Sequence, residues 1–110
     1  MRNGETVAEL EREFAAYVGA RYAIALCNGT ATLHTALVAL GLRPGGKVAV
    51  PPLTMSATTI AVLHAGGVPV FVDVDSETWL IAPFRVVERL HREDLPLGVP
   101  VSLYGLQWNG

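Results

Sequence analysis

The stretch KVAVPPLTMSATTIAVLHAGGVPVFVDV, residues 47–74, decides the fold. It opens with a short apolar run at 47–50 and closes with a second one at 68–74. Between these runs lies a helical pattern at 54–65, which ends at Gly66. Apolar runs joined by a helix are typical of parallel strands in a sheet that is buried on both faces. The stretch therefore predicts a strand–helix–strand unit.

The flanking sequence continues the same alternation. Before this unit, we predict a helix at 5–18, a buried strand at 22–27 and a helix at 30–40. After it, Pro83 can occupy the first position of a further helix, and residues 99–105 predict a last strand. The chain is therefore predicted to be α/β, with a mostly parallel sheet and helices on both faces.

Composition excludes several classes of protein. The 110 residues are 51% hydrophobic and 16% charged, which argues against disorder. A net charge of −2 without a basic patch argues against nucleic-acid binding. No apolar run reaches the roughly 20 residues of a membrane helix. One cysteine allows no internal disulfide and fits a reducing compartment, so we expect a cytoplasmic protein.

The apolar content also suggests that part of the surface is covered by a larger parent chain or a partner subunit. The predicted helix at 5–18 has an apolar face with charges opposite. The residues on that face are Val7, Leu10, Phe14, Tyr17 and Val18.

Ligands of such sheets bind beyond the carboxyl ends of the strands, and four places in the chain meet this condition. The first is the turn at 28–32. A glycine-containing turn that leads into a helix presents unpaired N–H groups at the positive end of the helix dipole, which suits a phosphate. Thr30 could add a hydroxyl. The turn matches neither the dinucleotide nor the P-loop glycine pattern, and a plain helix cap made by Asn28 or Thr30 is the simpler alternative.

The second place is the hydroxyl-rich loop at 52–58. Hydroxyls at the start of a helix usually cap it. The functional alternative is a loop that faces a ligand, in which Met55 offers a polarizable side chain to a flat ring.

The third and fourth places carry carboxylates and aromatic rings. Asp73 and Asp75 could take part in a metal site, but turn capping explains them better. Tyr104, Gln107 and Trp108 could face a ligand, or the two rings could cover the edge of the sheet.

The reactive side chains outside these places favour structural roles. Cys27 is expected to be a small buried residue, since no adjacent base is evident. His34 and His64 lie in helical patterns and are interpreted as packing or surface residues. Lys47, the only lysine, begins a predicted strand and therefore lies at the amino end of the sheet, opposite the ligand face. Schiff-base chemistry needs a lysine at the ligand face.

Three stretches together resemble one known family. They are GETVAELEREFAAYVGARYAIALCNGTATLHTALVALGL (4–42), PPLTMSATTIAVLHAGGVPVFVDVD (51–75) and VPVSLYG (99–105). Their order and spacing resemble the N-terminal part of the nucleotide-sugar aminotransferases, the DegT–StrS family. These are fold-type-I enzymes that use pyridoxal phosphate (PLP). The resemblance covers nearly the whole chain and depends on the segments jointly.

The resemblance implies roles for particular residues. In the family, a Gly-Thr-Ala turn holds the cofactor phosphate through backbone N–H groups, which carries over to Gly29, Thr30 and Ala31. An aromatic residue usually stacks on the pyridine ring at the position of Met55. The family often has His where this chain has Ser102.

The resemblance also implies that the family's Schiff-base lysine and pyridinium-pairing Asp come after these stretches. We therefore expect residues 1–110 to be an incomplete N-terminal portion of the PLP-binding large domain, without catalytic residues or a metal, and inactive alone. The complete enzyme would be a cytoplasmic homodimer that transfers an amino group, with glutamate as donor, to a nucleotide-linked keto sugar. The alternative is a non-catalytic truncated relative that acts as a binding or subunit-interaction module.

Overall fold

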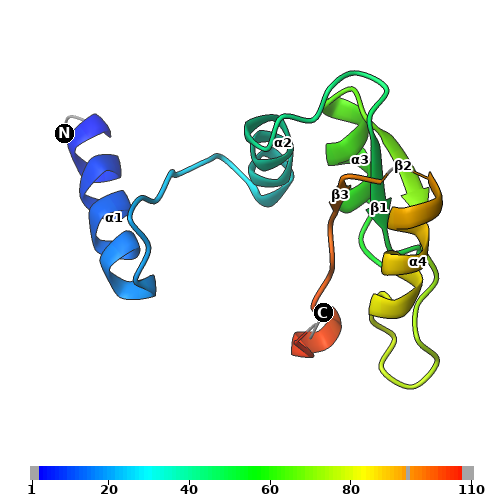
Figure 1. Cartoon of the computed structure of the whole chain (residues 1–110). Coiled ribbons are helices and arrows are strands. Elements are labelled where there is room, and N and C mark those ends of the chain that lie inside the picture. The colour runs from blue at the N-terminus through cyan, green and yellow to red at the C-terminus, as the bar shows by residue number, and fades with distance from the viewer. Residues whose placement is uncertain (1–2, 94, 108–110) are drawn as a thin grey trace.

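The computed structural model describes residues 3–93 and 95–107, and its centre is a parallel sheet of three short strands (Figure 1). β1 (Lys47–Val50) lies in the middle, between β2 (Val68–Phe71) and β3 (Leu97–Gly98). Both pairings of β1 are parallel, so the carboxyl ends of the three strands share one edge. The predicted α/β class with a parallel sheet is confirmed.

Helix α3 (Ala57–His64) crosses over from β1 to β2. The strand–helix–strand unit predicted from residues 47–74 is therefore confirmed, although the helix begins three residues later than the pattern suggests. The return to the sheet is tight, since the N–H of Gly67 donates to the carbonyl of Val62 at 2.9 Å.

The two faces of β1 contribute to two separate cores. Successive side chains of a strand point to opposite faces, and Val48, Ala49 and Val50 are all fully buried. One core contains Leu37, Leu42, Val48, Val50, Ala61 and Val62. The other contains Ala49, Val72, Ile81 and Leu95.

The three remaining α-helices are all among the predicted helices. Helices α2 (Gly29–Ala39) and α4 (Pro83–Glu93) begin within one residue of the predicted positions. Leu37 of α2 packs in the first core, together with α3, while Val86 of α4 packs against the second, so helices cover both faces of the sheet. Helix α1 (Asn3–Val18) begins two residues earlier than predicted. No helix among the described residues has the length and apolar character needed to cross a membrane.

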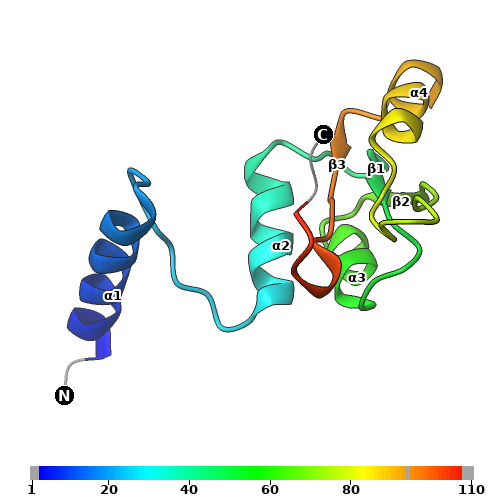
Figure 2. The ribbon, with the colours of Figure 1, turned by 90° about the horizontal axis from the view of Figure 1, so that it is seen from below.

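Helix α1 stands apart from the rest of the molecule. Figures 1 and 2 both show it beyond α2, joined to it by an extended segment. The apolar face predicted for α1 is consequently exposed: Leu10 and Phe14 are 56% and 54% exposed.

Two predicted strands are wrong. Residues 22–27 are extended but pair with no strand among the described residues, because the sheet lies on the far side of α2 (Figure 1). Residues 99–105 are also not a strand, since β3 ends at Gly98. The N–H of Val99 still donates to the carbonyl of Ala49 at 2.9 Å. The next bond of this parallel ladder would run to the carbonyl of Val99 from the N–H of residue 51, and Pro51 has none.

Candidate functional site

The first turn of α2 is built as a helix cap with spare donors. Asn28 has an extended backbone (φ −165°, ψ 170°), and its Oδ1 accepts the N–H of Ala31 at 2.9 Å. Within the described residues, the N–H groups of Gly29 and Thr30 have no acceptor. The predicted cap is therefore confirmed for Asn28, and two donors remain at the positive end of the helix.

A cavity of about 260 Å³ opens beside this turn. It is lined by Asn28, Thr30, Ala31, His34 and His64. The imidazoles of the two histidines meet edge to face, with their ring centres 6.2 Å apart. The cavity thus combines a hydroxyl, amide donors and two imidazoles, which is a set of groups suited to an anion.

The sequence does not predict that the two histidines lie together at this cavity. His34 is half-buried and His64 is exposed, in line with their interpretation as packing or surface residues. One signal was present, because Thr30 and His34 are four residues apart and so share a face of α2. The contact with His64 depends on how α3 packs against α2, which no local spacing reveals.

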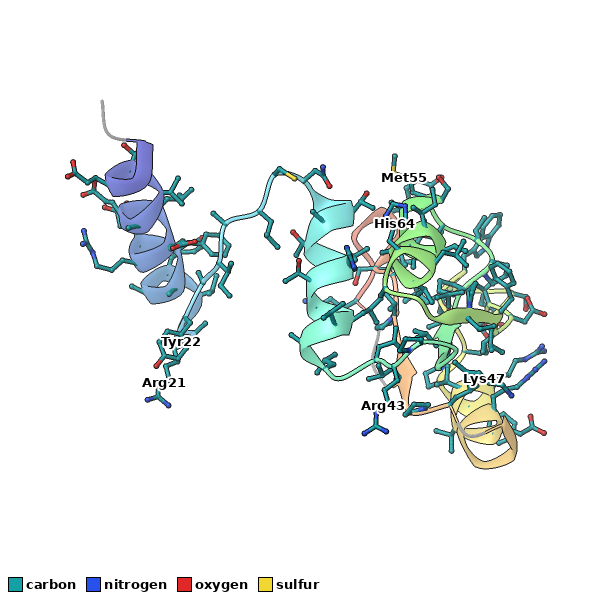
Figure 3. The ribbon with its side chains drawn as sticks, turned by 90° about the horizontal axis from the view of Figure 1, so that it is seen from above. Arg21, Tyr22, Arg43, Lys47, Met55 and His64 are labelled. Carbon is teal, nitrogen blue, oxygen red and sulfur yellow. The ribbon has the colours of Figure 1, made fainter. Side chains whose placement is uncertain are left out.

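Met55 lies on the loop between β1 and α3 and is 80% exposed. It does not line the cavity beside α2, although Figure 3 shows it above His64, on the same upper side as the first turn of α2. The loop is held by a hydrogen bond of 3.1 Å between the hydroxyls of Thr54 and Thr58. The capping interpretation of this loop is wrong for Ser56, whose side chain makes no cap bond.

The carboxylates after β2 serve the turn that leads to α4. Asp75 Oδ1 accepts the N–H groups of Glu77 and Thr78, at 3.0 and 2.9 Å, and the hydroxyl of Thr78 at 3.1 Å. These hydrogen bonds lower the pKa of Asp75, and the bond from the backbone N–H of Thr78 contributes most. Asp73 pairs with Arg85 at 3.1 Å. The predicted turn-capping role is confirmed for Asp75.

The other candidate residues lie away from the cavity. Tyr104 is 95% exposed on a short turn with φ 51°, Gln107 is exposed, and Trp108 lies outside the described residues. Cys27 was expected to be buried and is instead an exposed free thiol, because the segment before it packs on no sheet.

Lys47 begins β1, at the amino edge of the sheet, as predicted. Figure 3 shows Lys47 and Arg43 on the side of the molecule opposite to Met55 and His64. The only lysine of the chain is therefore remote from the cavity and from the carboxyl ends of the strands.

Comparison with known proteins gives a consistent result. The sequence profile of the DegT/DnrJ/EryC1/StrS aminotransferase family matches residues 1–108. The UDP-2-acetamido-2-deoxy-3-oxo-D-glucuronate aminotransferase of Pseudomonas aeruginosa is 40% identical over 102 residues, which are 93% of this chain and 28% of that protein. The 3-oxo-glucose-6-phosphate:glutamate aminotransferase of Bacillus subtilis is 38% identical over 103 residues, 94% of this chain and 23% of that protein.

The fold agrees with solved structures as well. The structure of ntda from Bacillus subtilis with bound cofactor PMP superposes with a TM-score of 0.84 at 37% sequence identity. The superposition covers 94% of this chain and 23% of that one. The chain thus spans about a quarter of the length of the relatives that it matches.

Proposed function

The chain belongs to the DegT/DnrJ/EryC1/StrS aminotransferase family, and from this premise we propose that it is the cofactor-phosphate-binding portion of a PLP-dependent sugar aminotransferase. The substrate would be a nucleotide-linked keto sugar and the donor glutamate. The names of two relatives support these choices, one a UDP-linked 3-oxo sugar aminotransferase and the other a glutamate-dependent enzyme. Both names favour an enzyme over a non-catalytic binding or subunit-interaction module.

The observation that carries the proposal is the first turn of α2. Gly29 and Thr30 offer two N–H groups without an acceptor among the described residues, and Thr30 adds its hydroxyl at the cavity. A Cβ on Gly29 would meet no atom within 4 Å, so there is open space for a phosphate against the backbone. Ala31 would contribute through its place on the cavity wall, because its N–H is already bound by Asn28.

Met55 is the proposed cover for the cofactor ring. Its thioether projects from the loop after β1 and is free to lie against a flat ring. When bound, PLP supplies an electron sink for the exchange of the amino group. The residues of this chain would then bind and orient the cofactor. We propose that the chain alone does not transaminate, since Lys47 lies at the opposite edge of the sheet.

A chimera tests the proposal. Residues 1–108 would replace the matching portion of the Pseudomonas aeruginosa relative, and the product would be assayed with glutamate and the UDP-linked 3-oxo sugar. We expect turnover, and we expect Thr30→Phe to weaken PLP retention on the order of tenfold by blocking the cavity. Thr35→Phe, exposed and later on the same helix, is the matched control.

The outcomes separate the alternatives. A chimera that folds and binds no PLP would contradict the proposed role of the turn, as would equal PLP retention in the two phenylalanine variants. Turnover of a keto sugar phosphate but not of the UDP-linked sugar would contradict the proposed substrate class. Turnover by the isolated 110-residue chain would contradict its proposed inactivity.

We further propose that the complete protein is a cytoplasmic homodimer. The exposed free thiol of Cys27 fits a reducing compartment, and the exposed apolar side chains of α1 leave surface for contacts between polypeptides. Sedimentation of the complete protein would check the dimer, and a monomer at micromolar concentration would contradict it.

A further inference from the structure

Another cavity lies at the amino edge of the sheet, after the last residues of α2. Its volume is about 510 Å³, against about 260 Å³ for the cavity beside the first turn of α2. It is lined by Gly41, Leu42, Arg43, Gly45, Gly46, Lys47 and Pro96. Figure 3 shows Arg43 and Lys47 on the side of the molecule opposite to Met55 and His64. The cavity is therefore separate from the candidate site, and its volume is within the range of roughly 300–1,000 Å³ that is usual for small-molecule sites.

The turn that forms one wall of this cavity is held by backbone hydrogen bonds. The N–H of Gly46 donates to the carbonyl of Arg43 at 2.8 Å. The N–H of Gly45 donates to the carbonyl of Gly66 at 2.8 Å, and Gly45 has a φ of 77°, which favours glycine. Leu42, in the same turn, is buried in the first core. The backbone from which Arg43 projects is therefore fixed before any ligand binds.

Both charged side chains at this cavity are cationic. Arg43 and Lys47 are exposed, and no acidic residue is among the described residues that line the cavity. Within the described part of the chain, no ion pair or hydrogen bond engages the guanidinium of Arg43. Two cations at one cavity repel each other, whereas an anion between them attracts both. The cavity is therefore suited to an anion, although the net charge of the chain is −2.

The two cations favour a phosphate. A guanidinium binds phosphate oxygens through two parallel N–H donors, and an ammonium adds a compact point charge. A phosphate monoester carries a charge of about −1.5 to −2 at pH 7, which two cations balance. A phosphate group alone fills only a small part of about 510 Å³, so the cavity leaves room for an organic group attached to it.

The other walls favour a sugar as that organic group. The carbonyls of Gly41 and Gly45 accept no hydrogen bond among the described residues, and sugar hydroxyls could donate to them. Pro96 adds an apolar wall. None of the described residues at the cavity is aromatic, so a nucleobase would find no ring on which to stack.

We propose that the cavity lined by residues 41–47 and Pro96 binds a sugar phosphate. The phosphate lies between the side chains of Arg43 and Lys47, and the sugar lies against the glycine turn and Pro96. Helix α2 separates this site from the proposed cofactor turn, since one follows its last residues and the other forms its first turn. The inference does not depend on the proposed function.

A titration of the 110-residue chain, followed by the amide signals in NMR, tests the proposal. The probes are glucose 6-phosphate, inorganic phosphate and glucose. We expect glucose 6-phosphate to shift the amide signals of residues 45–47, and inorganic phosphate to bind there on the order of tenfold more weakly. Glucose should leave these signals unchanged.

Four outcomes of this titration would overturn the proposal. The first is the absence of any shift at 45–47 with millimolar glucose 6-phosphate. The second is a set of shifts confined to residues 28–31, because the phosphate would then bind only at the proposed cofactor turn. Equal binding of glucose would contradict the role of the phosphate, and equal affinity for inorganic phosphate would contradict the role of the sugar.

A pair of arginine substitutions tests the proposed phosphate contact. Arg43→Gln removes the guanidinium from an exposed position of the cavity, and we expect it to weaken glucose 6-phosphate binding on the order of tenfold. Arg12→Gln is the matched control, because it changes the net charge equally at an exposed position of α1 outside the cavity. Equal affinities of the two variants would overturn the assignment of Arg43. None of these measurements involves PLP, so their failure would leave the proposed function untouched.

Discussion

Two apolar runs of this chain, KVAV at 47–50 and YAIALC at 22–27, have similar apolar sequences but adopt different structures. The first becomes β1, in which three side chains are fully buried and both edges are paired. The second stays extended, and Ile24 is 73% exposed. Among the described residues its backbone makes one hydrogen bond, from the N–H of Ala25 to the side chain of Glu11. The comparison teaches that an apolar run becomes a strand only where neighbours are within reach.

The proposed phosphate turn lies at the boundary between these two regions. Residues 22–27 lead directly into Asn28, while Leu37 anchors the same helix in the first core. The turn is thus fixed from its C-terminal side by packing and from its N-terminal side only by the cap. Substitutions in the two regions should therefore differ widely in how much they lower the free energy of unfolding.

The largest effect is expected for Val50→Asp. The side chain is fully buried, and an unpaired carboxylate there costs several kcal/mol, comparable to the roughly 5–15 kcal/mol total stability of a small domain. We expect loss of the folded state in far-UV circular dichroism. Val50→Ala should retain the fold and lose only about 2 kcal/mol in urea unfolding. A folded aspartate variant would show that the core around β1 is looser than its burial indicates.

A smaller effect is expected for Gly67→Ala, at the return from α3 to β2. A Cβ there would lie 2.9 Å from Leu42 Cδ2, 3.0 Å from Val62 Cγ1 and 3.1 Å from the carbonyl of Gly46. Overpacking of this kind costs about 1–3 kcal/mol in the free energy of unfolding. Gly29→Ala is the matched control, since its Cβ would meet nothing within 4 Å. Equal midpoints of urea unfolding for the two variants would contradict the close approach at Gly67.

Asn28→Ala tests the helix cap at the boundary between residues 22–27 and α2. The substitution removes the acceptor of the Ala31 N–H and should cost about 1 kcal/mol of stability. Asn28→Ser, which keeps a capping oxygen, should recover most of this loss. The measurement is urea unfolding followed at 222 nm, and an alanine variant as stable as the parent would show that α2 does not depend on its cap.

Most of the fold could be predicted where the evidence is local. The periodicity of residues 47–74 predicts the central unit, and the glycine and proline positions predict the limits of the helices. The two errors, at 22–27 and 99–105, concern strands whose existence depends on partners remote in sequence or on a backbone donor that Pro51, directly after β1, lacks. An apolar pattern specifies that a segment can be buried, and it does not specify by what.

The candidate site divides in the same way. The cap at Asn28 follows from local sequence, and Lys47 was correctly placed at the amino edge. The meeting of His34 and His64 depends on the packing of α2 on α3, which local sequence does not determine. Cys27 was misjudged because its burial was inferred from a strand that does not form.

The smallest effect is expected for Ile24→Lys in the isolated chain. This substitution lies in the second of the two apolar runs, at 22–27. Ile24 is 73% exposed and its backbone groups are unpaired within the part of the chain that the structure describes, so lysine replaces few contacts. Exposed substitutions usually change stability by less than about 0.5 kcal/mol, and we expect the urea midpoint to stay within this range. A loss of 2 kcal/mol or more would show that residues 22–27 are already packed in the isolated chain. The contrast between the runs would then lie in their position in the chain, and no longer in the presence of partners.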